Sequence, residues 1–246
     1  MREIIFEIVG EINIDILKNC TCEYPINISI DDIKNKYFKD KHEVKHKKIH
    51  DTSIVGIING LWANAMGKGG VIPIQARFYP CDTFLNLKLT GMQGDVMKES
   101  MNVALTLAWN LTSFENKEKI RQLYEDKKHG IHIHCPEGSV PKDGPSAGTA
   151  ITSVIYSLLN QKKIRYNIAI TGEISLDGCV TEIGGLDLKF LGGIKAGVKE
   201  FLYPVENEKD YKSFMEKYEK TEIVKDITFH PVSNVHEVFD LIFDDE

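Results

Sequence analysis

The chain has 246 residues, of which 42% are hydrophobic and 27% are charged, and its formal net charge is −6. This composition is typical of a globular protein with a sizeable core, and it excludes wholesale disorder and collagen-like repeats. No apolar run reaches the roughly 18–20 residues of a membrane-spanning helix, and Glu3 and Glu7 interrupt the first apolar stretch, so no secretory signal is expected. We therefore expect a soluble intracellular protein, and the negative charge argues against a nucleic-acid binder.

The cysteines indicate a reducing compartment. Their number is odd, they are scattered, and no Cys-x-x-Cys pair occurs among Cys20, Cys22, Cys81, Cys135 and Cys179. We expect reduced structural thiols rather than disulfides or a metal site. That expectation fits the cytoplasm, or an organelle matrix such as that of the mitochondrion.

The first fifty residues differ in character from the rest. Residues 26–30 have the pattern of a strand that runs into a short helix, with Ser29 or Asp31 as its cap. Residues 34–50 are dense in lysine and histidine, which favours a solvated linker over a binding patch. We place a boundary near residues 45–51, so that residues 1–50 form an N-terminal segment and residues 51–246 the main domain.

The main domain alternates predicted strands and helices. Strands are predicted at 54–61, 71–78, 83–89, 131–134, 168–171, 201–203 and 227–229. Helices are predicted from Asp95, within 114–128 after the end of that first helix, and at 145–160, 185–199 and 235–243. Asp177-Gly178 predicts a hairpin turn, and Asn234 with Glu237 a capping box. The fold class is therefore α/β of the α+β type, with mixed sheets and packed helices.

Ser146 lies where a serine can act as a nucleophile. Apolar residues from Ala147 onward recur at helical spacing, and Pro145 suits the first helical position. Ser146 would then lie in the first turn, where unpaired backbone N–H groups can receive a developing oxyanion. The alternative is that Ser146 only caps a core helix.

A serine nucleophile needs a base, and the unusual candidate is Lys189. At 3.6 residues per turn Lys189 shares a stripe with Leu186, Phe190 and Gly193. Burial among apolar groups would lower its pKa and provide a neutral amine. The hydroxyl of Thr171 could lie against that amine. The alternative is a surface lysine that extends its amine to solvent.

Two histidines share one face of a predicted strand. His132 and His134 are two positions apart and could in principle hold a metal. Because no third ligand is evident, we favour a structural role for both.

Three sequence blocks carry a resemblance to a known family. They are the block Pro-Lys-Asp-Gly-Pro-Ser-Ala-Gly around Ser146, Thr-Gly-Glu-Ile-Ser-Leu-Asp-Gly from Thr171, and Ile-Gly-Gly-Leu-Asp-Leu-Lys ending at Lys189. Lys189 follows Ser146 by 43 positions, which equals the family spacing. The chain resembles the proteolytic domain of Lon, an ATP-dependent Ser–Lys protease, over about residues 52–243. Residues 28–33 also resemble the end of the small helical part of the family's ATPase module.

The resemblance implies a serine endopeptidase in which Ser146 and Lys189 form the catalytic dyad. Thr171 would orient the amine, and Asp143, Gly144 and Pro145 would belong to the nucleophile motif, with Asp143 taking part in an inactive arrangement. The implied substrates are unfolded or damaged polypeptides, and the implied assembly is a homo-hexameric ring. No metal and no membrane are implied, and a nucleic-acid site at residues 34–48 is disfavoured.

The chain also departs from the family. No G-x-x-x-x-G-K-[ST] phosphate loop occurs, so ATP and magnesium would belong to an ATPase module outside this chain. We favour a carboxy-terminal piece of a longer protein over a stand-alone relative. Gln75 stands where the family often has Glu, and Trp62-Ala63-Asn64 replaces the commoner Trp-Thr. The rival hypothesis is a catalytically silent ring-forming or peptide-binding module on the same fold.

Overall fold

The computed structural model describes residues 2–19, 26–32, 48–65, 67–136 and 143–243. Two compact units divide the chain, residues 1–45 and residues 46–246, and each is described by itself.

The first unit contains helix α1 (Arg2–Asn19) and the short helix α2 (Ile30–Asp32). The Ser29 hydroxyl accepts a hydrogen bond from the Asp32 backbone N–H at 3.0 Å, and the Asp32 carboxylate accepts one from the Ser29 N–H at 2.8 Å. This reciprocal pair confirms Ser29 as the cap. The predicted strand before it is wrong, because residues 26–29 have no regular secondary structure. The predicted linker and basic stretch lie largely outside the described residues.

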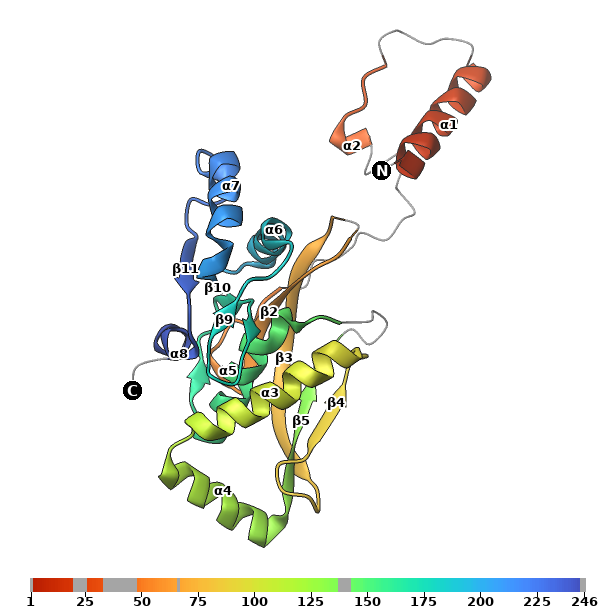
Figure 1. Ribbon diagram of the computed structural model, residues 1–246. Helices are drawn as coiled ribbons and strands as arrows, with labels where there is room; N and C mark the ends of the chain where they lie inside the picture. The colour runs from red at the N-terminus through yellow and green to blue at the C-terminus, as the bar shows by residue number, and fades with distance from the viewer. Residues whose placement is uncertain (1, 20–25, 33–47, 66, 137–142, 244–246) are drawn as a thin grey trace. The chain divides into compact units, whose positions relative to one another are not determined.

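A seven-stranded mixed sheet forms the centre of the second unit, in the order β11-β10-β7-β2-β3-β5-β4 (Figure 1). Its strands are β2 (Ile57–Ala63), β3 (Gly69–Pro80), β4 (Leu87–Thr90), β5 (His129–His134), β7 (Ile168–Ile170), β10 (Glu200–Pro204) and β11 (Thr228–Val232). The pairs β2–β3 and β3–β5 are antiparallel, whereas the remaining neighbours are parallel. The expected mixed α/β class is confirmed.

Helices cover both faces of the sheet and enclose two hydrophobic clusters. They are α3 (Asp95–Leu111), α4 (Phe114–Lys127), α5 (Gly148–Asn160), α6 (Leu186–Ala196), α7 (Glu208–Tyr218) and α8 (Val235–Ile242), with single turns η2 (Pro145–Ala147) and η3 (Val205–Asn207). The first cluster joins α3 and α5 to one face of β3 and β5, and Figure 1 shows α3 crossing in front of these strands. The second cluster joins α6 and α7 to the opposite face, around Phe190 and Phe201.

Two smaller two-stranded sheets complete the unit. β1 (Ile54–Val55) pairs with β6 (Lys163–Ile164), and β8 (Glu173–Ile174) pairs with β9 (Val180–Thr181). The second pair is the predicted hairpin, in which the Gly178 N–H donates to the Ser175 carbonyl at 3.0 Å. The predicted cap is also present, since the Asn234 side chain accepts from the backbone of His236 and Glu237.

Several boundaries differ from the sequence expectation, most clearly at residues 83–89 and 111–114. The strand predicted at 83–89 begins only at Leu87, because residues 83–86 turn and Leu85 has a φ of 50°. The helix expected to continue past residue 114 instead ends at Leu111, and Ser113 caps a new helix by accepting from the Asn116 N–H. Among the described helices, none has the length and apolar character needed to cross a membrane.

Candidate active site

Ser146 lies at the middle of the single turn η2, immediately before α5. Pro145 opens this turn, and Gly144 before it has a φ of 119°, a conformation that favours glycine. The turn is of the 3-10 type, so Ser146 precedes the α-helix that we expected to contain it. At the start of a helix the first backbone N–H groups have no intrahelical acceptor, and the Ser146 N–H belongs to this set. Ser146 is half-buried, and no hydrogen bond of its hydroxyl occurs among the described residues.

Lys189 is buried on the first turns of α6, with 3% of its surface exposed. The flanking Leu186 and Phe190 are buried with it, as the predicted stripe required. No carboxylate of the described residues forms an ion pair with the Lys189 amine. Burial therefore acts unopposed and lowers the pKa of Lys189 from 10.5 to about 8. The alternative of a solvent-exposed lysine is excluded.

Thr171 joins the lysine to the serine. The Lys189 Nζ donates a hydrogen bond to the Thr171 Oγ1 at 3.0 Å, and the Thr171 hydroxyl donates to the Ser146 carbonyl at 3.2 Å. Thr171 follows β7, is fully buried, and pairs its own N–H with the Leu202 carbonyl of β10. The central sheet therefore fixes the hydroxyl that contacts both elements, and the predicted contact between Thr171 and the amine is present.

Two further contacts around Ser146 were not expected from the sequence. The Gly172 N–H donates to the same Ser146 carbonyl at 2.9 Å. The Gly172 carbonyl accepts from both the N–H and the hydroxyl of Thr149, at 3.1 and 2.9 Å. Residues 171–172, directly after β7, thus hold both the η2 turn and the start of α5 in place. The Thr171-Gly172 dipeptide was visible in the sequence, but its partners Ser146 and Thr149 are 23 to 26 positions away.

Asp143 points away from this group, to the start of α3. Its Oδ1 accepts from the Met97 N–H at 3.1 Å and from the Gly144 N–H at 3.0 Å. The α3 cap residue, Gly94, supplies no side-chain cap of its own, and a Cβ on Gly94 would lie 2.3 Å from the Asp143 Cγ. Asp143 therefore caps α3 from a distant part of the chain. Residues 141 and 142 of the predicted nucleophile motif lie outside the described residues.

The histidine pair is built into the sheet. The Thr90 hydroxyl lies 2.9 Å from the His132 Nε2 and 2.7 Å from the His134 Nδ1. These contacts agree with a structural role. Within the described part of the chain, no group of three His, Cys, Asp or Glu residues is arranged to hold a metal ion.

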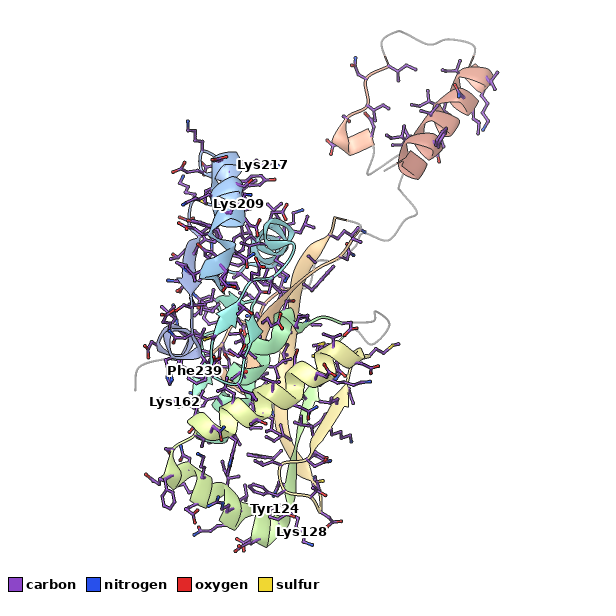
Figure 2. All side chains as sticks on the ribbon, in the orientation of Figure 1. Tyr124, Lys128, Lys162, Lys209, Lys217 and Phe239 are labelled. Carbon is purple, nitrogen blue, oxygen red and sulfur yellow. The ribbon has the colours of Figure 1, made fainter. Side chains whose placement is uncertain are left out.

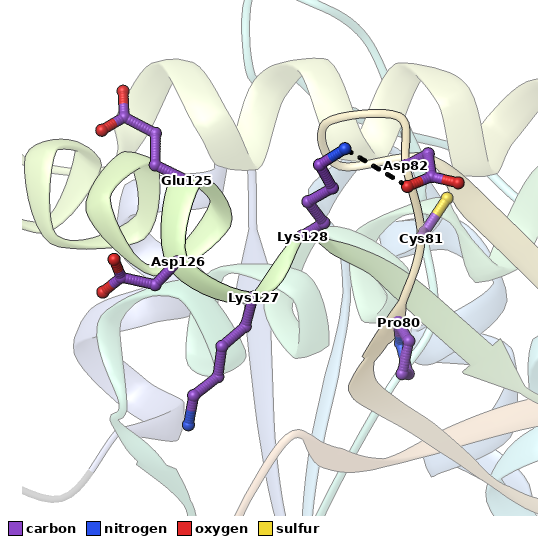
Figure 3. Close-up of a pocket in the computed structure, with 7 residues that line it drawn as sticks. All are labelled: Pro80, Cys81, Asp82, Glu125, Asp126, Lys127 and Lys128. Atoms are coloured by element: carbon purple, nitrogen blue, oxygen red, sulfur yellow. Dashed lines mark hydrogen bonds and ion pairs between the residues drawn. The ribbon is translucent and has the colours of Figure 1, made fainter.

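A separate hollow of about 400 Å³ lies at the other end of β3 and β5 (Figure 3). It is lined by Pro80, Cys81, Asp82 and residues 125–128, and Lys128 lies 3.5 Å from the Asp82 carboxylate. Figure 2 places Tyr124 and Lys128 beside each other at the end of α4, where the Tyr124 hydroxyl donates to the Asp82 carbonyl. None of these residues contacts Ser146, Thr171 or Lys189, so the hollow does not belong to the candidate site.

Comparison with known proteins agrees with this fold. Residues 28–245 match the family described as the Lon protease (S16) C-terminal proteolytic domain. The match covers most of the chain, and the chain belongs to this family.

Individual relatives extend the comparison. A Lon protease homolog of Acanthamoeba polyphaga mimivirus is 41% identical over 203 residues, which are 78% of this chain and 19% of the relative. The Lon protease of Ureaplasma parvum is 34% identical over 96% of this chain and 29% of its own length. That of Methanosphaera stadtmanae is 36% identical over 86% of this chain and 25% of its own. The chain thus spans less than a third of the length of these relatives.

Proposed function

We propose that this chain is a serine endopeptidase domain in which Ser146 is the nucleophile and Lys189 is the general base. One observation carries the proposal: a lysine with 3% exposure and no acidic partner among the described residues donates to a threonine that also binds the serine backbone. A charged amine would be costly in such a place, whereas a neutral amine can accept a proton.

The proposed mechanism has two halves. The Ser146 hydroxyl attacks the scissile carbonyl while its proton passes to the Lys189 amine, and the resulting ammonium gives that proton to the leaving amine. The Ser146 N–H at the start of the turn donates to the oxyanion. Lys189, neutral again, then takes a proton from a water that attacks the acyl-enzyme, and the Ser146 hydroxyl is restored.

The neighbouring residues would position this chemistry. Thr171 orients the amine through its hydroxyl, and Gly144 and Pro145 shape the turn that presents Ser146. We further propose that Asp143, while it caps α3, holds the segment before Ser146 in a resting arrangement.

The wider biology is proposed from the family. The substrates would be unfolded or damaged polypeptides, and the working assembly a homo-hexamer in the cytoplasm or an organelle matrix. Residues 1–50 would be the end of an ATPase small domain with its linker. The sequence contains no G-x-x-x-x-G-K-[ST] loop, so no step in this chain is assigned to ATP or magnesium.

Substitution of the dyad tests the proposal. Ser146→Ala and Lys189→Met should each lower the hydrolysis of an unstructured protein by on the order of 10³-fold or more, because each removes one member of a single unit. The controls are Ser175→Ala in the exposed hairpin and Lys195→Met at the exposed end of α6. Circular dichroism should show that all four variants are folded.

The pH dependence separates a lysine base from other mechanisms. The rate should rise with pH and level off above about pH 8, where the Lys189 amine is neutral.

Near-normal cleavage by either dyad variant would contradict the mechanism. Binding of unfolded protein without any cleavage by the wild-type chain would instead favour the silent peptide-binding module.

A further inference from the structure

On one side of the central sheet, beyond the end of α6, the described helices of the second unit leave a polar surface uncovered. Alternate residues of β3 and β5 are buried on the opposite side in the first cluster, for example Ile74 and Ile133. Helix α6 reaches the near side of β3 at Gly69 and Gly70, at the opposite end of that strand. The remaining near-side residues form what we call the basic face: Gln75, Arg77, Tyr79, Lys88, Thr90, His132 and His134.

The basic face is ordered by contacts among its own side chains. The Thr90 hydroxyl contacts both imidazoles, and one hydroxyl proton can serve only one of them, so neutral rings take opposite donor and acceptor roles. The Tyr79 ring stands edge-on to His132 at 6.2 Å, and the Lys88 ammonium lies 5.6 Å above the Tyr79 ring. The array is therefore held in place before any ligand arrives.

The charge of the basic face is positive, although the whole chain has a net charge of −6. Lys88 and Arg77 are exposed, and neither forms an ion pair with a described acid. The Arg77 guanidinium donates to the carbonyls of residues 55, 56 and 76, which fix its position without neutralising it. Burial, and then the charges of Lys88 and His134, lower the pKa of His132. Such a surface attracts carboxylates and repels metal cations.

One edge of the basic face borders the segment that carries Ser146. The Thr90 carbonyl accepts from the Cys135 N–H at 3.0 Å, and β4 leads through the turn at 91–94 into α3. At the end of that turn, Gly94 contacts the Asp143 carboxylate, three positions before Ser146. A polypeptide that leaves the candidate site on this side would meet the basic face.

We propose that the basic face is a docking surface for acidic, extended stretches of the polypeptide substrate. This docking role rests on the proposed function and specifies the class of substrate. The occupant follows from charge complementarity, because the described residues of this face offer two cations without an ion pair to a described acid, two imidazoles and no carboxylate. Docking on the basic face would lower KM for substrates with acidic flanks and leave the chemical step unchanged.

The test uses the 246-residue chain and two peptides that share one cleavable segment, flanked by glutamates in one and by glutamines in the other. Lys88→Gln should raise KM for the glutamate peptide by about 2- to 5-fold, without changing kcat or the KM of the glutamine peptide. The matched control is Lys217→Gln on α7, since the Lys217 ammonium lies 5.5 Å above the Tyr218 ring at a distant surface (Figure 2). The preference should fade as salt rises from about 0.05 to 0.5 M.

Several results would overturn the proposal. One is a ratio of the KM values of the two peptides that is the same in Lys88→Gln as in wild type. Another is a rise in the KM of the glutamate peptide in Lys217→Gln as large as that in Lys88→Gln. A shift in sedimentation on Lys88→Gln with unchanged KM values would assign the face to a second copy of the chain instead.

If no peptide is cleaved, the proposed function fails separately. Fluorescence anisotropy of the labelled peptides on Ser146→Ala then decides the docking surface alone. Selective binding of the glutamate peptide that Lys88→Gln weakens supports docking, and equal binding of both peptides rejects it.

Discussion

At the scale of a single residue, burial of Lys189 lowers the stability of the fold but provides the neutral amine that the proposed chemistry needs. Its folded pKa of about 8 lies below the value of 10.5 for an unburied lysine. The unfolded chain therefore binds more protons between these two values, and stability rises with pH across that window. Below pH 8, burial of the Lys189 amine lowers the free energy of unfolding by the full amount, on the order of 3 kcal/mol. A buried lysine that destabilises the fold is better explained by a role in catalysis than by a role in folding.

We predict that Lys189→Met raises the free energy of unfolding at pH 7, by up to about 3 kcal/mol, because a flexible apolar chain replaces a buried amine. The gain should shrink as the pH rises from 8 toward 10.5. Urea unfolding at pH 7 and pH 10 measures the effect. Lys195→Met, at an exposed position of the same helix, should change stability little at either pH. A destabilised Lys189→Met at pH 7 would show that the amine is not held under a desolvation cost.

At the scale of secondary-structure elements, α6 lies on β3 with backbone against backbone. A Cβ on Gly192 would lie 2.2 Å from the carbonyl carbon of Gly69 and 2.3 Å from the N of Gly70. Neither atom belongs to a side chain that could rotate away. Helix α6, which carries Lys189, can therefore lie this close to the sheet only because residue 192 is a glycine.

Gly192→Ala should accordingly cost about 1–3 kcal/mol of stability and displace α6, with a loss of peptidase activity. Gly184→Ala is the matched control, because a Cβ there has nothing within 4 Å. Thermal unfolding and activity assays compare the two variants. Equal stability of both would mean that α6 and β3 can separate without consequence.

The elements also show what the sequence can predict. Periodicity located β2, β3, α3, α5 and α6, and it placed Lys189 on a buried stripe, because burial of one helix face is a local signal. It did not predict the η2 turn around Ser146, because hydrogen bonds from Thr171 and Gly172 to the Ser146 carbonyl define that turn. It also did not predict Asp143 as the cap of α3, since Asp143 and Met97 are 46 positions apart. Contacts across the fold leave no periodic trace in the sequence.

At the scale of the whole molecule, the hydrophobic core belongs to the second unit. Both clusters are built from residues 49–243, and Ile49 is the first of the described residues that packs against either of them. The Ile49 N–H donates to the Ala196 carbonyl at the end of α6, at 3.2 Å. The chain from Ile49 onward is thus part of the packed unit, and Ile49 lies within the region of residues 45–51 where the sequence predicts the boundary.

Two truncations test where the folding unit begins. A chain of residues 46–246 should keep the thermal midpoint of the full chain within about 2 °C, because no member of either cluster is removed. A chain of residues 51–246 lacks Ile49 and its hydrogen bond to Ala196, so its midpoint should fall by about 2–4 °C for each kcal/mol lost. Differential scanning calorimetry of the three chains, with near-ultraviolet circular dichroism of the aromatic cluster around Phe190, provides the comparison. Equal midpoints for both truncations would place the boundary after residue 50. A large loss already in residues 46–246 would mean that the first unit contributes to the stability of the second.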